Sequence, residues 1–247
     1  MTIQYLLFLG IGHLIGDFYL QSDKIAKYKD EKYKGVLIHS LEYYVAFLLT
    51  VLPVFCLDMI LAATYAAIIH FVIDTIKYLI CRKRIIKKSC NVFIVDQCVH
   101  ISSFFVLAYT LDYFDFSIGN LKYIEYWLTT FNLNFEIIAR WFLSILFIYK
   151  PVNIFIKNFL GEYKPKENNE IVMTDNKAGR KIGTIERLIM LIFLSQNQFA
   201  ALGFVLTATS IARYDKITKD EKFAEYYFLG TLTSTLCVIL CKILFLL

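Results

Sequence analysis

Proline and charged residues are scarce in this sequence. Only three prolines and 19% charged residues occur among 247 positions, whereas 58% of the residues are hydrophobic and 17% are aromatic. The mean hydropathy is +0.56, which is higher than an ordinary soluble domain shows. Apolar stretches of about 18 residues or more recur, and that length matches a lipid bilayer. The composition predicts an all-α fold, a polytopic transmembrane helical bundle with about six to eight membrane segments.

Cysteine pairs, a cleavable leader and nucleic-acid-binding patterns are also missing. The six cysteines form no CxxC pair, so we expect neither disulfides nor a cysteine-based metal site. The first apolar stretch has no basic residues before it and no small-residue cleavage site, and His13 and Asp17 interrupt it. We therefore expect a retained span. The basic runs lack interleaved aromatic residues on a soluble module, so membrane lipids rather than nucleic acid are the expected partners.

The apolar stretches set the expected organisation. Spans are predicted at about 3–21, 36–57, 59–80, 91–111, 137–160 and 224–246, with a broken apolar region at 183–213. We group them into three parts: a four-helix membrane domain (1–111) that carries a polar site, an external connection (112–136), and C-terminal membrane helices (137–247).

Basic residues indicate the orientation in the membrane. The net charge is +5, and the basic residues gather in four short segments between the spans: 24–35, 81–88, 161–181 and 213–222. Short loops rich in Lys and Arg are typical of the cytoplasmic side. This pattern predicts a multi-pass protein of the cell inner membrane, with the N-terminus and the 112–136 connection outside.

The region 183–213 must begin and end on one side of the membrane, because basic segments flank it on both sides. Its middle, LSQNQFAALG, is polar and rich in small residues, which predicts a hairpin of two short helices. The alternative is that one end of the region is assigned wrongly. Further along, Gly230 and Ser234 are four residues apart, a spacing typical of a close helix contact.

A polar stripe interrupts the apolar spans. All four histidines lie inside spans, and three of them have an aspartate four residues away, in HLIGD, HFVID and DQCVH. Four residues is just over one helical turn, so the members of each pair face the same way. The expected topology places the stripe in one layer about 10 Å deep near the cytoplasmic ends of the spans. Its members are His13, Asp17, His39, His70, Asp74, Asp96 and His100.

These seven side chains are the predicted metal ligands. Histidine and carboxylate suit Zn, Mn or Fe, and a bundle core can gather ligands from several helices. Three carboxylates beside neutral imidazoles leave about three negative charges, which one or two divalent ions would balance. Asp17, Asp74 and Asp96 are also the candidate catalytic residues, because one of them is available as a general base. Two alternatives stay open: a metal-free proton or cation pathway, and a structural network of hydrogen bonds.

Further polar residues continue the same helix faces. They are Gln21, Glu42, Lys77 and Gln97. Such groups orient metal ligands or neutralise the charge of a substrate. Lys77 has an alternative place among the lipid headgroups, since long basic side chains extend to the membrane surface.

Four segments resemble the bacterial membrane-protein family catalogued as domain of unknown function 3307. They are GHLIGDFYLQSDKIAKYK, LIHSLEYY, HFVIDTIKY and FIVDQCVHI, within residues 1–111. Downstream, GRKIGTIERLIMLIF, TSIARY and EYYFLGTLTS are similar to the extension of longer members. The resemblance implies membership but no established activity. In residue types alone, the stripe also resembles inner-membrane families of metal-dependent hydrolases.

The leading hypothesis is a metal-dependent hydrolase that acts on a phosphoester or lipid-linked substrate at the cytoplasmic face. Basic residues within 24–34 and 82–88 would attract an anionic head group. The alternatives are a cation or proton transporter or channel, and a non-catalytic scaffold or sensor. A pathway needs polar groups that continue to the far leaflet. The segments AFLLTVLPVFCL and SSFFVLAYTL contain few ionisable residues, which favours a site open to one side.

Overall fold

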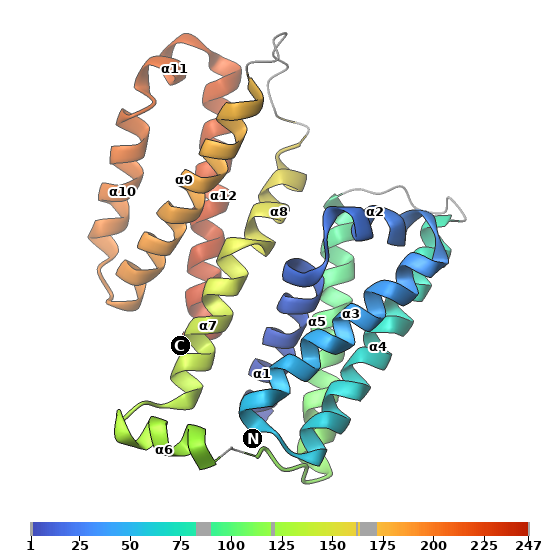
Figure 1. Cartoon of the computed structure of the whole chain (residues 1–247). Helices are drawn as coiled ribbons and strands as arrows, with labels where there is room; N and C mark the ends of the chain where they lie inside the picture. Colours follow the sequence, from blue (N-terminus) through green and yellow to red (C-terminus); the bar gives the residue numbers. More distant parts are fainter. Residues whose placement is uncertain (1, 83–89, 120–121, 162, 164–171, 247) are drawn as a thin grey trace. The chain divides into compact units, whose positions relative to one another are not determined.

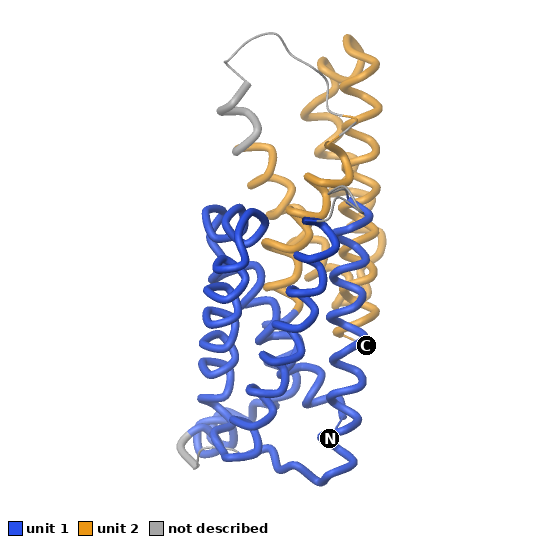
Figure 2. The backbone as a smooth tube through the Cα atoms, turned by 90° about the vertical axis from the view of Figure 1, so that its right-hand side faces the viewer, with its two compact units in different colours: residues 1–143 blue, residues 144–247 orange. Residues whose placement is uncertain are grey.

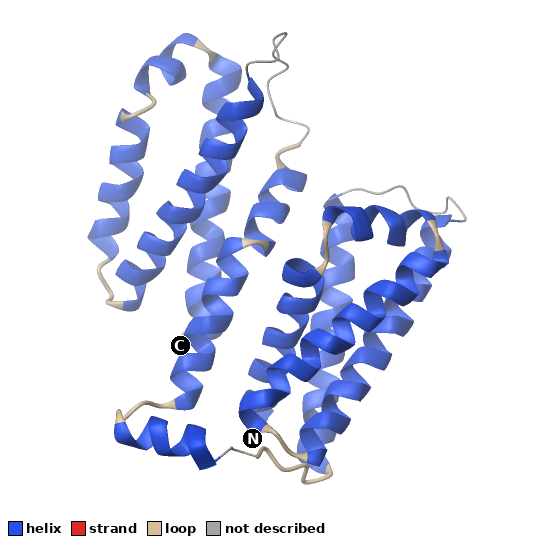
Figure 3. Ribbon diagram, in the orientation of Figure 1, coloured by secondary structure: helices blue, strands red, loops and turns tan. Residues whose placement is uncertain are grey.

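The chain folds into helices. The computed structural model describes residues 2–82, 90–119, 122–161, 163 and 172–246, and none of these residues forms a strand (Figure 3). Six helical segments within them are long and apolar enough to cross a membrane: Thr2–Leu20, Tyr33–Val54, Leu57–Arg82, Cys90–Tyr113, Phe135–Phe159 and Glu221–Phe245. Their ends lie within three residues of the predicted spans. The prediction of an all-α polytopic membrane protein is confirmed.

The chain divides into two compact units, Met1–Leu143 and Ser144–Leu247 (Figure 2). The boundary falls inside helix α7 (Phe135–Tyr149). Before α7, the predicted external connection contains a short helix, α6 (Lys122–Thr130), whose Tyr126 and Trp127 are exposed. Exposed aromatic residues of this kind are enriched at membrane–water interfaces.

The first unit contains a ring of four long helices. α1 (Thr2–Leu14) continues into the π-helix η1 (Ile15–Leu20), and α3 (Tyr33–Val51) is followed by a 3₁₀ turn, η2 (Leu52–Val54). α4 (Leu57–Arg82) and α5 (Cys90–Tyr113) complete the ring. α1 and α4 each pack against both α3 and α5 (Figure 1). The ring therefore encloses a single interior.

One half of that interior is an apolar core. Tyr5, Leu9, Phe47 and Met59 are fully buried there, and Leu111 is almost fully buried. In a membrane such side chains stabilise the bundle through close van der Waals packing, since lipid tails are equally apolar. Apolar residues on the outer faces of the same helices are exposed, as lipid contact requires. The polar stripe lies in the other half of the interior.

A short helix covers the polar half. Residues 24–35 were expected to be a loop, but Asp23–Glu31 form helix α2. The side-chain oxygen of Ser22 caps α2 by accepting a hydrogen bond from the Ile25 amide at 3.3 Å. α2 packs against α3 and α4 (Figure 1). Gly35 permits this approach, because a Cβ atom there would lie 2.4 Å from the backbone nitrogen of Lys29. The consequence is that Lys29 reaches the polar half of the ring.

The second unit contains the predicted hairpin. α9 (Val172–Ser195) and α10 (Phe199–Ile211) pack against each other, and Asn197 lies in the turn between them. Asn197 adopts a left-handed conformation with φ 56°, which asparagine tolerates better than most residues. α12 (Glu221–Phe245) packs against α9, α8 (Pro151–Phe159) and α11 (Tyr214–Lys219). The polar interruption in the sequence is therefore the turn of a helical hairpin.

A buried arginine joins three helices of this unit. The guanidinium of Arg187 donates hydrogen bonds to Asn153 Oδ1 at 2.7 Å, Thr184 Oγ1 at 3.1 Å and Ser234 Oγ at 3.1 Å. Arg187 is 2% exposed, and no carboxylate among the described residues forms an ion pair with it. Ser234, expected at a close helix contact, thus contacts α9 through this arginine. The cluster connects α8, α9 and α12.

Candidate metal centre

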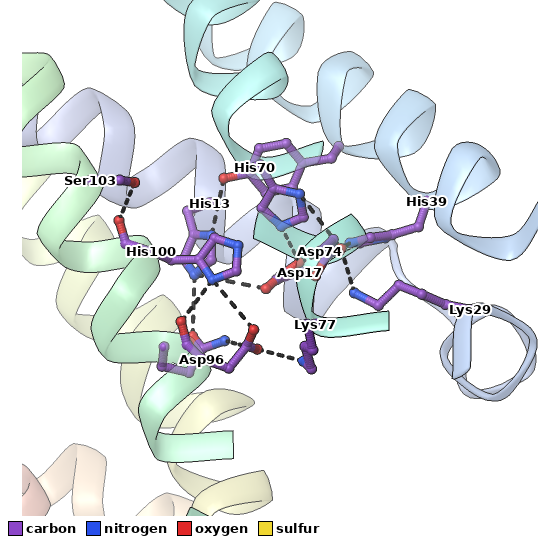
Figure 4. Close-up of polar contacts among 12 residues, drawn as sticks. His13, Asp17, Lys29, His39, His70, Asp74, Lys77, Asp96, His100 and Ser103 are labelled. Carbon is purple, nitrogen blue, oxygen red and sulfur yellow. Dashed lines mark hydrogen bonds and ion pairs between the residues drawn. The ribbon is translucent and has the colours of Figure 1, made fainter. Parts of the chain in front are cut away.

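The seven predicted ligands meet in the polar half of the four-helix ring (Figure 4). They come from five elements: α1 supplies His13, η1 Asp17, α3 His39, α4 His70 and Asp74, and α5 Asp96 and His100. All of them are buried except Asp17, whose side chain is only 8% exposed. Spans that alternate in direction have therefore brought all seven groups to one level of the bundle.

Three overlapping groups of these residues can hold a metal ion. They are His13, Asp17 and His70; His39, His70 and Asp74; and Asp74, Asp96 and His100. Within each group the ligand atoms lie within 4.8 Å of one another. His70 belongs to the first two groups and Asp74 to the last two, so the three groups form one connected cluster.

Asp17 is the tightest point of the cluster. Its Oδ1 atom lies 3.0 Å from Nε2 of His39 and 3.0 Å from Nε2 of His70. Ligand atoms that share one ion at about 2.0–2.1 Å are about 2.9–3.4 Å apart in octahedral or tetrahedral geometry. Each Nε2 atom therefore lies at a distance from Asp17 Oδ1 that fits both a hydrogen bond and neighbouring ligands of one ion.

A change of helix type positions Asp17. The α-helical turns of α1 end at Leu14, and Asp17 lies in the π-helical turn η1. π-helical turns are rare and frequently occur at functional sites, because the extra residue per turn redirects side chains. Asp17 still faces its neighbour one turn back, with Oδ2 3.8 Å from His13 Nε2. The same turn brings Oδ1 to the histidines of α3 and α4.

Asp74 connects the two sides of the cluster. Its Oδ2 atom lies 3.6 Å from His39 Nε2 and 3.7 Å from His70 Nδ1. The same oxygen accepts a hydrogen bond from Lys29 Nζ at 2.8 Å. Asp74 also belongs to the group that contains Asp96 and His100. Asp74 would therefore be available as a ligand to an ion in either of its two candidate groups.

His100 has one ring nitrogen with a free lone pair that can bind a metal ion. Its Nδ1 lies 2.8 Å from the backbone oxygen of Asp96. A carbonyl only accepts, so Nδ1 carries the proton and Nε2 of the neutral ring has a free lone pair. That Nε2 is buried and has no hydrogen-bond partner among the described residues. Metal-binding histidines typically donate the other ring N–H to a carbonyl or carboxylate in this way.

Buried polar atoms without a hydrogen-bond partner gather around the cluster. Four belong to predicted ligands: His39 Nδ1, His70 Nδ1, Asp96 Oδ1 and His100 Nε2. Buried polar atoms are normally paired, and an unpaired one indicates strain or an interaction that is not yet satisfied. The donor types, their spacing and these unpaired atoms fit a divalent ion. The buried His and Asp groups can therefore hold a metal.

The four neighbouring residues named from the sequence differ in their contacts. Gln97 Oε1 lies 3.2 Å from His13 Nε2, and Lys77 Nζ lies 2.6 Å from Asp96 Oδ2. Lys77 therefore contacts the cluster in this structure. Gln21 Nε2 and Glu42 Oε2 are buried without a partner, and neither residue hydrogen-bonds to a predicted ligand within the described part of the chain.

Two contacting residues were not identified individually from the sequence. The Tyr43 hydroxyl lies 3.1 Å from His13 Nδ1, and its ring stacks on His70 with the centroids 3.5 Å apart. Tyr43 follows His39 by four residues, so the spacing that revealed the aspartates also pointed to it. Lys29 was hidden in a segment expected to be a loop. Lys29 pairs with Asp74 and Lys77 pairs with Asp96. Two of the three carboxylate charges that were counted from the sequence are therefore neutralised by lysines.

Comparison with known proteins gives one match. A search of curated proteins and a search of solved structures found nothing similar to this chain. A family model described as "Protein of unknown function (DUF3307)" matches residues 5–129. The matched region is half of the chain and includes every member of the His/Asp cluster. This integral membrane protein therefore belongs to the DUF3307 family.

Proposed function

We propose that this protein is a membrane metal-dependent hydrolase whose centre holds one or two divalent ions of Zn, Mn or Fe. The observation that carries the proposal is the position of Asp17 Oδ1, 3.0 Å from Nε2 of both His39 and His70. A finished hydrogen-bond network would leave few buried polar atoms unpaired, yet His39 Nδ1, His70 Nδ1, Asp96 Oδ1 and His100 Nε2 have no hydrogen-bond partner within the described residues. Two buried imidazoles on one oxygen, with a second carboxylate beside them, favour a shared ion instead.

Some residues of the cluster would bind the metal ion, and others would accept a proton. A divalent ion at such a site supplies Lewis acidity toward water or a phosphoryl oxygen. His13, Asp17 and His70 would hold it, since they form one of the candidate groups. Tyr43 contacts His13 and stacks on His70, which keeps both rings in place. Asp74 and Asp96 belong to a neighbouring candidate group, so with a single ion bound either carboxylate is available to accept a proton at an Oδ atom.

The shape of the bundle interior supports a site open to one side. Beyond the cluster, the other half of the ring interior is packed with apolar side chains such as Phe47, Met59 and Leu111. A proton or cation pathway would need ionisable groups to continue through that half. The apolar packing of this half of the interior therefore favours a hydrolase over a transporter.

Charge supports a cytoplasmic position for the open side. The basic residues of segments 24–35 and 81–88 predict the inner membrane, with the N-terminus outside; residues 83–89 lie outside the described part of the chain. At that depth the substrate class we propose is a phosphoester or a lipid-linked molecule delivered by the bilayer. The basic residues of α2 would attract its anionic group.

Elemental analysis tests the metal proposal directly. Protein purified in detergent without added chelator should contain Zn, Mn or Fe at about one or two ions per chain. His70→Ala and Asp74→Ala should lose it. Asp58→Ala is the matched control, since Asp58 lies on the same helix as Asp74 but hydrogen-bonds to Ser117. Metal below stoichiometry that does not respond to His70→Ala or Asp74→Ala would refute the centre.

Hydrolysis is tested separately from metal binding. The metal-loaded protein should release inorganic phosphate from vesicles that contain a lipid phosphomonoester such as phosphatidic acid, and Asp17→Asn should abolish the release. A second arm measures uptake of the same cation into sealed proteoliposomes. Metal binding with cation uptake and no hydrolysis would replace the hydrolase with a transporter.

A further inference from the structure

Two lysines already occupy carboxylates of the proposed metal centre. Lys29 Nζ lies 2.8 Å from Asp74 Oδ2, and Lys77 Nζ lies 2.6 Å from Asp96 Oδ2. Asp74 and Asp96 belong to one candidate metal group. The lysines come from different elements, Lys29 from α2 and Lys77 from α4. Each ammonium therefore neutralises a carboxylate that an ion bound in the group of Asp74, Asp96 and His100 would also need.

A metal ion and these ammonium groups can share the carboxylates only at a large electrostatic cost. A metal bound at about 2.0–2.2 Å from a carboxylate would lie only a few ångströms from the ammonium on the same group. Two positive charges at that distance repel strongly where the surroundings are poorly polarisable. Metal loading should therefore push both ammonium groups away from Asp74 and Asp96.

A small cavity offers the displaced ammonium groups a place to go. Lys29 and Lys77 both line a cavity of about 20 Å³, and Asp74 forms part of its wall. That volume holds about one water molecule. Asp30 is the other acidic residue in the lining, and its negative charge would repel an anion. The Lys77 side chain is 28% exposed and that of Lys29 is 12% exposed, so both lysines reach the surface beside this cavity.

We propose that Lys29 and Lys77 form an anion site that metal binding switches on. In the metal-free protein the lysines neutralise Asp74 and Asp96. In the loaded protein their ammonium groups turn to the open side of the cavity, which itself holds only about one water molecule, and bind the phosphate group of the substrate there. This inference rests on the proposed function, and it names phosphate as the chemistry recognised and the metal as the condition for recognition.

Linkage gives this proposal a measurable form. If the metal frees the lysines for phosphate, phosphate must in return raise the affinity for the metal by the same factor. Replacing either lysine by glutamine removes a competing positive charge. Both variants should therefore bind metal more tightly than the wild type, and both should lose the effect of phosphate.

The experiment is a calorimetric titration of the full chain in detergent with Mn²⁺, and separately with Zn²⁺. Each titration is run with and without inorganic phosphate at constant ionic strength. We expect phosphate to tighten metal binding at least about fivefold in the wild type, within the usual range of coupling between sites. Lys29→Gln and Lys77→Gln should remove that gain. Lys24→Gln is the control, since Lys24 is exposed at the start of α2.

Each outcome has a defined meaning. Metal that binds equally with and without phosphate overturns the anion site and leaves the metal centre standing. Glutamine variants that keep the phosphate effect, or that bind metal more weakly than the wild type, also overturn it. A wild type that binds neither Mn²⁺ nor Zn²⁺, and that contains no Fe by elemental analysis, refutes the proposed function itself. The wild-type comparison needs no variant, so it decides the question even if a glutamine variant fails to fold.

Discussion

Gly16 lies directly against the ring of Tyr43: a Cβ atom at Gly16 would be 2.5 Å from Tyr43 Cδ2. The close approach lets η1 bring Asp17 to the histidine of α3. Gly16→Ala should therefore push Tyr43 out of place and destabilise the protein by about 1–3 kcal/mol, the usual cost of overpacking. Thermal unfolding in detergent measures the loss.

Gly203→Ala is the matched control for that substitution. Gly203 lies inside α10, and a Cβ atom there meets nothing within 4 Å. Alanine at this position should leave the melting temperature unchanged or raise it slightly, because alanine favours a helix over glycine. Equal effects of the two substitutions would mean that the contact between Gly16 and Tyr43 does not matter for stability.

Much of the architecture follows from the sequence because hydrophobic length alone defines a membrane span. All six spans were predicted, and the hairpin was deduced from the charges on either side of it. The convergence of the His/Asp groups followed from their spacing of four residues and from the alternating direction of the spans. Both inferences use periodicity and length, which are properties of the chain itself.

The sequence did not reveal the features that depend on close contact. The π-helical turn around Asp17 has no sequence signature that periodicity detects. Helix α2 was missed because its many charges resemble a basic loop, although Ser22 is a recognisable cap. Without α2, Lys29 could not be paired with Asp74, and the charge of the site was miscounted. These features arise from packing between elements distant in sequence.

Removing one hydroxyl should weaken the metal centre without unfolding the protein. Tyr43→Phe keeps the ring that stacks on His70 but loses the oxygen that contacts His13 Nδ1. Loss of a group that orients a ligand typically lowers metal affinity about 10–100-fold. We expect a drop in that range by metal titration, with little change in melting temperature.

The neighbouring tyrosine is the control. The Tyr44 hydroxyl lies 3.2 Å from Thr64 Oγ1, outside the cluster. Tyr44→Phe should therefore leave metal affinity unchanged. If Tyr43→Phe also binds metal normally, Tyr43 contributes to packing and not to ligand orientation.

The proposed orientation in the membrane predicts which positions a reagent can reach. In a variant without the six native cysteines, Ser22→Cys should be labelled from the cytoplasmic side and Asn132→Cys from the outside. Inverted and right-side-out vesicles with a membrane-impermeant thiol reagent distinguish the two. Labelling of Asn132→Cys from the cytoplasm would reverse the topology and remove the site from the cytoplasmic face.

Replacing Arg187 should lower the stability of the protein and leave its metal content unchanged. Arg187→Met removes the donors that reach Asn153, Thr184 and Ser234. Side-chain hydrogen bonds between membrane helices average about 0.6 kcal/mol each, so we expect a loss of about 1–2 kcal/mol with an unchanged metal content. Arg187→Lys should not restore stability, since an ammonium cannot reproduce the planar fork of donors. A lower metal content in Arg187→Met would assign this residue a functional role.

The last prediction concerns the dependence of Asp74 and Asp96 on each other. In a purely structural network they act separately, because Asp74 pairs with Lys29 and Asp96 pairs with Lys77. Their losses in Asp74→Asn and Asp96→Asn would then add in the double variant, and EDTA would have no effect. In a metal centre they act as one unit, because both belong to the same ligand group. EDTA should then lower the melting temperature of the wild type. Each single variant should melt like the EDTA-treated wild type, and the double variant should melt little lower. Asp58→Asn should keep the full response to EDTA, since Asp58 lies at the far end of α4. A wild type indifferent to EDTA, with additive losses in the variants, would assign the His/Asp cluster to helix packing alone.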